Sequence, residues 1–326
     1  MEESDVFDAL DLKLLHALEI DGRVPFSRVA AVVGVSDQTV ARRYRRLRAG
    51  AGLRVVGVRD TGRLGRDAWM LRLRCAPDGA EAIATGLARR PDTAWVHLMS
   101  AGTEVVCMTL PRTPGDHDDL LFGKLLRSRS LVEITAHQLV HRFYGGRTGW
   151  IGKHRPLTAE QTAALAPDLP PAAPGPARIA PDDEPLVAAL KADGRATHPE
   201  LQRLTGRSES SVKRRIAALR GSGALYFDAE YDSARFGFTS SAMLWITVAP
   251  GELDAVGRAM AEHPETAHVS AITGSANLMA SILTRDTASL YAYLSGPLGS
   301  LAGVRHVESA PYLRRFKELT YPRPLR

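Results

Sequence analysis

"SDQTVARRYRRLRAGAGLRVVGVR", the stretch from Ser36 to Arg59, contains seven arginines and one acidic residue. Ser36 is a good helix N-cap, and Val40, Tyr44 and Leu47 recur at the i, i+4, i+7 spacing of one apolar helix face. Most of the arginines therefore lie off that face. The segment LRVVGV then alternates like a β-strand. The stretch predicts a basic helix followed by a short strand.

Two shorter amphipathic segments precede this basic helix. The first has apolar residues at helical spacing and ends at Asp21-Gly22, and the second stops at Gly34. The apolar positions are Leu10, Leu14, Ala17 and Leu18 in the first, and Phe26, Val29, Ala30 and Val33 in the second. Two helices, a sharp turn, a basic helix and a strand form the pattern of a winged helix-turn-helix.

The second helix of a helix-turn-helix enters the major groove, where its N-terminal residues contact base edges. Hydroxyl and amide groups can bond to base edges, and arginines can bind phosphates or guanine. The predicted DNA contacts are Ser36, Gln38, Thr39, Arg42, Arg43, Arg45 and Arg46. The alternative is that the basic face is only solvated surface. The formal charge of +6 and the pI near 9.5 favour an anionic partner mildly.

The helix-turn-helix pattern occurs twice, at an offset of 172 residues. Fifteen of the 43 positions from Asp11 to Leu53 are identical to their partners in the second copy. The second basic helix supplies Ser208, Ser210, Ser211, Lys213, Arg214 and Arg215 as further candidate DNA contacts. Ala217 and Ala218 replace Arg45 and Arg46, so we expect this head either to bind DNA less tightly or to be mainly structural.

The rest of each half is predicted to be a small α+β body with the order β-α-β-β-α-β, the ferredoxin-like pattern. Each body then has one sheet face without helices. We expect that face to carry Trp69, Leu71, Leu73, Met243 and Trp245, and to pack against the other body or a second chain. A linker with seven prolines joins the halves, with one short helix predicted at its Thr158 capping box. The predicted segments are head 1–60, body 61–155, linker 156–181, head 182–232 and body 233–326.

This order of head and body resembles the Lrp/AsnC family of bacterial transcription factors, in a subgroup with two fused copies. The resemblance is carried by "LL.AL..DGR", by "VGVSDQTVARRYRRL" and by the glycine turn between the middle strands of each body. It implies homodimers or larger rings that bind double-stranded DNA, and a small effector, often an amino acid, bound by the bodies.

The family carries a Gly-x-x-Asp type of turn at its effector cleft, and this chain departs from it. Glu104 lies near the position of the acid in the first copy, and Asn277 lies there in the second. A tight turn can offer backbone N–H groups to a carboxylate, while an acid holds an amine. Ordinary hairpin turns would have the same composition. The candidate effector residues are Gly102, Thr103, Glu104, Gly274, Ser275 and Asn277.

Other chemistry has little support in the sequence. Cys75 and Cys107 lie in apolar strand-like runs, and no disulfide framework, secretion signal or membrane span is recognisable, so we expect a cytoplasmic protein. His137 and His141 lack companions for a metal site, and we expect neither a metal nor another cofactor. The glycine-rich stretch 143–156 is either an arm that contacts DNA or the other half, or a flexible exit from the last strand.

Two alternatives to a regulator remain open. Sirohaem decarboxylases resemble the same family and use a His and an Arg at the haem; here only His97 lies in the corresponding region, without their aromatic and Asn-rich setting. The other alternative is a ligand sensor whose heads serve only assembly. The arginine-rich helix favours a DNA-binding regulator that is not an enzyme.

Overall fold

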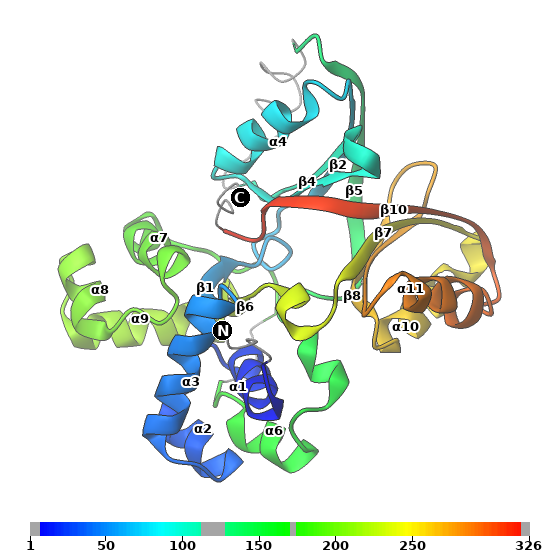
Figure 1. Cartoon of the computed structure of the whole chain (residues 1–326). Coiled ribbons are helices and arrows are strands. Elements are labelled where there is room, and N and C mark those ends of the chain that lie inside the picture. The colour runs from blue at the N-terminus through cyan, green and yellow to red at the C-terminus, as the bar shows by residue number, and fades with distance from the viewer. Residues whose placement is uncertain (1–6, 112–127, 170–173, 321–326) are drawn as a thin grey trace. The chain divides into compact units, whose positions relative to one another are not determined.

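The computed structural model describes residues 7–111, 128–169 and 174–320 (Figure 1). The chain divides into two compact units, each built from both halves of the sequence. The head unit comprises Met1–Gly65 and Gly146–Gly237, and the barrel unit comprises Arg66–Gly145 and Phe238–Arg326. The two heads thus belong to one unit and the two bodies to the other.

Each head contains the three helices and the strand that the sequence predicts. In both, the first helix is anchored by buried leucines, and a glycine in the left-handed conformation, Gly34 or Gly206, ends the second helix at the sharp turn. The elements are α1 (Ala9–Ile20), α2 (Phe26–Val33), α3 (Asp37–Gly50) and β1 (Arg54–Arg59) in the first head, and α7 (Glu184–Ala192), α8 (His198–Thr205), α9 (Glu209–Gly221) and β6 (Leu225–Glu230) in the second.

The wings of the two heads form a two-stranded antiparallel sheet. Strand β1 pairs with β6 along its whole length, from Arg54 opposite Glu230 to Arg59 opposite Leu225 (Figure 1). Helix α6 (Ala159–Leu165) packs on α1 and α2 and begins at the predicted capping box of Thr158. Short helical turns lie at Ile151–His154 (η3), Pro181–Asp183 (η4) and Ser233–Phe236 (η5).

The barrel unit contains two four-stranded antiparallel sheets, each with the 4-1-3-2 strand order of the ferredoxin-like pattern. The helix predicted near residues 115–126 of the first body lies outside the described residues. The elements of the first body are β2 (Trp69–Cys75), α4 (Ala80–Arg89), β3 (Thr93–Met99), η1 (Ser100–Gly102), β4 (Glu104–Thr109) and β5 (Leu131–Tyr144). Those of the second are β7 (Ser240–Val248), η6 (Pro250–Glu252), α10 (Leu253–Glu262), β8 (Thr266–Ile272), β9 (Leu278–Thr284), α11 (Thr287–Tyr293), a π turn η7 (Leu294–Leu298) and β10 (Val304–Lys317).

Two long strands join these sheets into a closed eight-stranded barrel. Strand β5 pairs with β2 of its own body up to Gln138, and from Leu139 onward it pairs with β8 of the other body. Strand β10 does the same, pairing first with β7 and then, from Tyr312, with β3. The two bodies therefore pack against each other within one chain. The exchange of strand ends also leaves the barrel without an unpaired edge.

The barrel interior is mostly apolar, but its lining corrects one prediction. Met243 and Trp245 pack between the sheets, as expected, together with Met70. Leu71 and Leu73 do not: they belong to the core beneath α4, as part of the cluster that contains Leu87 and Ile83. Because successive side chains of a strand alternate between faces, Met70 and Arg72 are the residues of β2 that face inward. The predicted face was therefore wrong for Leu71 and Leu73, and also for Trp69, which lies on their side of β2.

Candidate DNA-binding surface and effector site

Helix α3 is held by its apolar face and exposes its polar face. Ser36 accepts a hydrogen bond from the backbone N–H of Thr39 at 3.2 Å and so fixes the start of the helix. The apolar side chains that bury the opposite face are those that the sequence predicts, Val40, Tyr44 and Leu47. Of the seven candidate DNA contacts, four are exposed and three are half-buried: the exposed ones are Ser36, Gln38, Arg42 and Arg45, and the half-buried ones are Thr39, Arg43 and Arg46.

The two half-buried arginines of α3 have acidic partners within the head. Arg43 Nη1 lies 2.7 Å from Asp8 Oδ2 and 3.1 Å from Asp11 Oδ2, and the Asp11 side chain is fully buried. Arg46 lies 3.8 Å from the same Asp11 oxygen and stacks over the ring of Phe7. Burial raises the pKa of Asp11, against the effect of the two arginines. These arginines therefore join α3 to the start of α1, a role that the sequence did not reveal.

The second head repeats this anchor with equivalent residues. Arg215 corresponds to Arg43 and Asp183 to Asp11, and Arg215 Nε donates to Asp183 Oδ1 at 2.9 Å. The Asp183 side chain is almost fully buried, and Arg207 contacts it as well. The two heads have different surfaces but keep the same Arg–Asp ion pair. The function of this pair is therefore to hold the first and third helices of a head together.

The remaining cations differ between the two recognition helices. On α3, Arg42, Arg45 and Arg48 have no acidic partner among the residues that the structure describes. On α9, Arg214 is the one cation without an acidic partner among those residues. Lys213 pairs with Glu209 at 2.9 Å, Arg215 pairs with Asp183, and Arg220 pairs with Asp21 of the other head. Ser208 caps α9 by accepting from the N–H of Ser211, and Ser210 is exposed, as Gln38 is.

Two arginines that had no predicted role join the heads by hydrogen bonds. Arg23 donates to the carbonyl oxygens of Gly194 (2.6 Å) and Ala196 (3.0 Å). Arg195 donates to those of Gly22 (2.7 Å) and Val24 (3.1 Å), which are the equivalent positions of the other copy. The Asp-Gly-Arg tripeptides, which are identical in the two copies, are the sequence signal of this contact.

The stretch 143–156 is not a flexible exit where it follows the barrel strand. It contacts the other half of the chain, as one alternative predicted, because Arg147 donates to the Gly223 carbonyl oxygen of the second head. Trp150 and Ile151 are buried in the head unit, and the N–H groups of Ile151 and Gly152 donate to the carboxylate of Glu19 at 3.2 and 3.3 Å. Tyr231 donates its hydroxyl to the same carboxylate at 2.8 Å. Burial outweighs these hydrogen bonds and raises the pKa of Glu19 to about 7.

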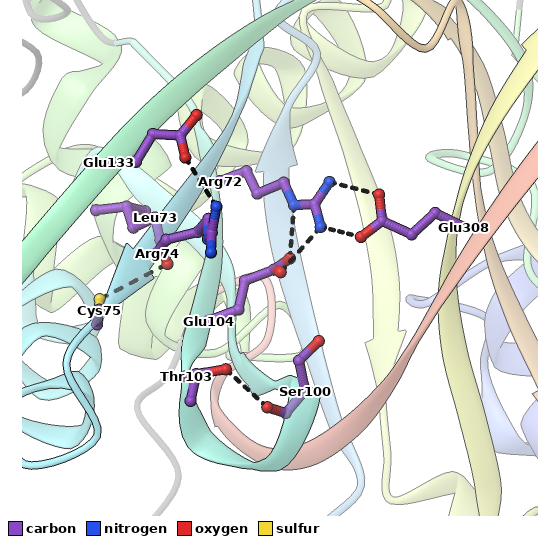
Figure 2. A network of polar contacts seen from close by, with 9 residues as sticks. All are labelled: Arg72, Leu73, Arg74, Cys75, Ser100, Thr103, Glu104, Glu133 and Glu308. Carbon is purple, nitrogen blue, oxygen red and sulfur yellow. Dashed lines mark hydrogen bonds and ion pairs between the residues drawn. The ribbon is translucent and has the colours of Figure 1, made fainter.

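The candidate effector turn of the first body ends in a partly buried ion network (Figure 2). Thr103 Oγ1 donates to the Ser100 carbonyl oxygen, and Glu104, which is 5% exposed, accepts two hydrogen bonds from Arg72 at 2.9 and 3.0 Å. The same guanidinium reaches Glu308 on β10, which belongs to the second body. Desolvation works against the charge on Arg72, but its bonds to both carboxylates prevail and raise its pKa. Lying 5.1 Å over the ring of Trp245, Arg72 links the bodies across the barrel interior.

The equivalent turn of the second body is occupied by internal contacts. Asn277 Oδ1 accepts from the Val248 N–H, and Asn277 Nδ2 donates to the Val248 carbonyl oxygen, both at 2.8 Å. Gly274 has a φ of +117°, and a Cβ built there would lie 2.6 Å from His137 Nδ1. Ser275 accepts a hydrogen bond at its carbonyl from Thr247. By contrast, a Cβ on Gly102 would meet only Leu313, at 3.8 Å.

The described residues contain no group of three or more His, Cys, Asp or Glu that could hold a metal ion. His137 bonds to the Thr273 carbonyl and stacks near Trp245, so it has a structural place. His97 is buried and lies 3.6 Å from Glu318. No helix in the described parts of the chain is long and apolar enough to cross a membrane.

Comparison with known proteins gives matches for both kinds of domain. Residues 7–48 match the model of the AsnC-type helix-turn-helix domain, and residues 241–322 match that of the Lrp/AsnC ligand-binding domain. The HTH-type transcriptional regulator FL11 of Pyrococcus horikoshii is 30% identical over 139 residues, which are 42% of this chain and 91% of the relative. The regulator LrpA of Pyrococcus abyssi is 24% identical over 136 residues, 41% of this chain and 96% of the relative.

Among solved structures, the siroheme decarboxylase NirDL is similar over nearly the whole chain. It has a TM-score of 0.63 at 16% identity, and the match covers 97% of this chain and 94% of that one. At this identity the likeness shows the fold alone.

Proposed function

The chain belongs to the Lrp/AsnC family of DNA-binding transcription regulators, and we propose that it contacts DNA through the exposed polar faces of α3 and α9. The observation that carries this proposal is a set of exposed arginines on α3, Arg42, Arg45 and Arg48, that have no acidic partner within residues 7–111, 128–169 and 174–320. Uncompensated cations at the N-terminal half and along one face of a recognition helix are placed to bind phosphates and guanine. Arg43 and Arg46 support this surface from behind through Asp11.

The test is a DNA titration at several salt concentrations. The variant Arg42→Ala/Arg45→Ala is expected to lose roughly 5- to 150-fold in affinity for each base contact removed, and about one unit of salt slope for each phosphate contact. Arg258→Ala is the control for the loss of a surface charge, because it removes one charge from an exposed residue of α10 in the barrel unit. Equal affinity and slope in wild type and the double variant would refute the proposal.

We further propose that a small effector, such as an amino acid, acts at Gly102, Thr103 and Glu104 of the first body. Arg72 and Glu104 pair with each other there and so place a cation and an acid side by side for the two charges of an amino acid, whereas the amide of Asn277, bonded to Val248, carries no charge. Amino acids should therefore raise the melting temperature of wild type but not of Glu104→Gln. Glu133→Gln is the control, since the exposed Glu133 pairs with the exposed Arg74. An unchanged response in Glu104→Gln would contradict this site.

Regulation rather than catalysis is the proposed role, in the cytoplasm and with a homodimer as the assembly. The relatives that match at the sequence level are named as transcription regulators, while the decarboxylase shares the fold. Absorbance titration with an iron porphyrin separates the two functions: no binding at micromolar concentrations agrees with the proposal, and a stoichiometric complex contradicts it. Light scattering in solution gives the number of chains in the assembly.

A further inference from the structure

We propose that one chain reads a DNA site made of two inverted half-sites of unequal strength, with α3 on the stronger half and α9 on the weaker. This inference rests on the proposed function and deepens it, because it specifies the kind of DNA site. The four hydrogen bonds of Arg23 and Arg195 and the pairing of the wings carry the argument.

The contacts between the heads are reciprocal. Arg23 of the first copy bonds to Gly194 and Ala196, and Arg195 of the second bonds to Gly22 and Val24, each displaced by the repeat offset of 172 residues. The wing strands that join the heads are antiparallel. Contacts in which residue i meets j and j meets i define a two-fold relation. Two recognition helices related in this way match the two-fold symmetry of inverted half-sites in a duplex.

The same contacts hold the heads in one arrangement within a single chain. Arg220 Nη2 lies 2.9 Å from Asp21 Oδ1, and both side chains are mostly buried. Gly22 and Gly194 lie so close to the opposite wing that an added Cβ would approach its atoms to 2.7 and 2.9 Å. The spacing of α3 and α9 is therefore set by packing, and a second chain is not needed to align them on DNA.

The two recognition helices are unequal in the groups that they offer. Among the described residues, helix α3 presents three arginines without acidic partners, and α9 presents only Arg214. At the equivalent exposed position, Gln38 can form a bidentate pair with adenine, whereas the shorter Ser210 has a single hydroxyl. The half-site under α3 should therefore supply more of the affinity and more of the sequence preference.

Directed cleavage of DNA by a tethered iron chelate tests this proposal. The chelate is attached to Gln38→Cys or Ser210→Cys, two exposed equivalent positions, and burial of Cys75 and Cys107 keeps the native thiols from reacting. The probe is the strongest site recovered from genomic DNA by the wild-type protein. We expect the Gln38→Cys reagent to cut at one half of the site and the Ser210→Cys reagent at the other.

Affinity measurements on the same probe test whether α3 contributes more to binding than α9 does. Arg42→Ala should weaken binding by roughly 5- to 150-fold, Arg214→Ala by less, and the control Arg258→Ala not at all. Inverting one half-site to make a direct repeat should cost affinity comparable to deleting it. Cleavage of both halves by the Gln38→Cys reagent alone would overturn the inference, since two chains would then each use their first head. Absence of DNA binding by wild type would instead refute the proposed function.

Discussion

Replacing Arg43 by alanine should destabilise the first head, although Arg43 lies beside the exposed arginines of the recognition helix. The Asp11 side chain is completely buried, and the Arg43 side chain, 20% exposed, lies 3.1 Å from it. Removing one partner of a buried ion pair costs about 3–5 kcal/mol. Because Arg43 is partly exposed and Arg46 remains 3.8 Å from Asp11, we expect about 2–3 kcal/mol here.

A melting experiment measures this loss. For a unit of this size, 1 kcal/mol shifts the melting temperature by about 2–4 °C, so Arg43→Ala should lower it by roughly 5–10 °C. Arg42→Ala, whose side chain is exposed, should stay within about 0.5 kcal/mol of wild type. Both are measured by calorimetry, and DNA affinity is measured at a temperature where every variant is folded.

A second substitution separates the pair from other effects of the arginine. Asp11→Asn removes the buried charge, so adding it to Arg43→Ala should recover part of the lost stability. The reasoning is refuted if Arg43→Ala melts like wild type and loses DNA affinity as Arg42→Ala does. In that case Arg43 would be a DNA contact and not an anchor of the head.

Three further predictions follow from local geometry. Gly274→Ala should destabilise the barrel unit by about 2–4 kcal/mol in urea unfolding, because a positive φ combines there with a clash against a histidine nitrogen. Gly102→Ala should cost only about 1 kcal/mol, since its Cβ would meet no close atom. Equal losses for the two variants would be inconsistent with the packing. Burial raises the pKa of Glu19 from 4.5 to about 7, so its stabilising effect should be complete below about pH 4.5 and should be lost as the pH rises through 7. The free energy of unfolding should fall by about 3 kcal/mol over this range. Glu19→Gln should reduce this pH dependence, and an unchanged dependence would contradict the assignment. Burial raises the pKa of the Cys75 and Cys107 thiols to about 11 and 12, so neither should react with a thiol reagent at pH 8 until the chain unfolds, and rapid labelling of the folded protein would show otherwise.

The regular elements could be predicted because their signals are local. The N-caps Ser36 and Ser208, the turn glycine Gly34 and the apolar spacing of α3 all lie within a few residues of the structure that they determine. The strands were predicted equally well, since turn residues bound each one. Repetition strengthened these assignments, because two independent segments gave the same order.

The contacts that give the site its character were not predictable, because they join distant residues. Asp11 and Arg43 are 32 residues apart, so the basic run looked like one uniform charged face. Strand β2 carries large apolar residues on both of its faces. Nothing in the local sequence shows that Leu71 faces α4 and that Met70 faces the barrel interior. The exchange between β5 and β8 depends on pairing across more than 120 residues, for which a single sequence contains no signal.

We propose that this chain is a sequence-specific DNA-binding regulator that acts through α3. The most direct measurement is to incubate sheared genomic DNA with wild type, with Arg42→Ala/Arg45→Ala and with the control Arg258→Ala, and to sequence what each retains. We predict a few strongly enriched sites for wild type and the control, and none for the double variant. The same sites retained by the double variant, or no DNA retained by wild type, would contradict the account.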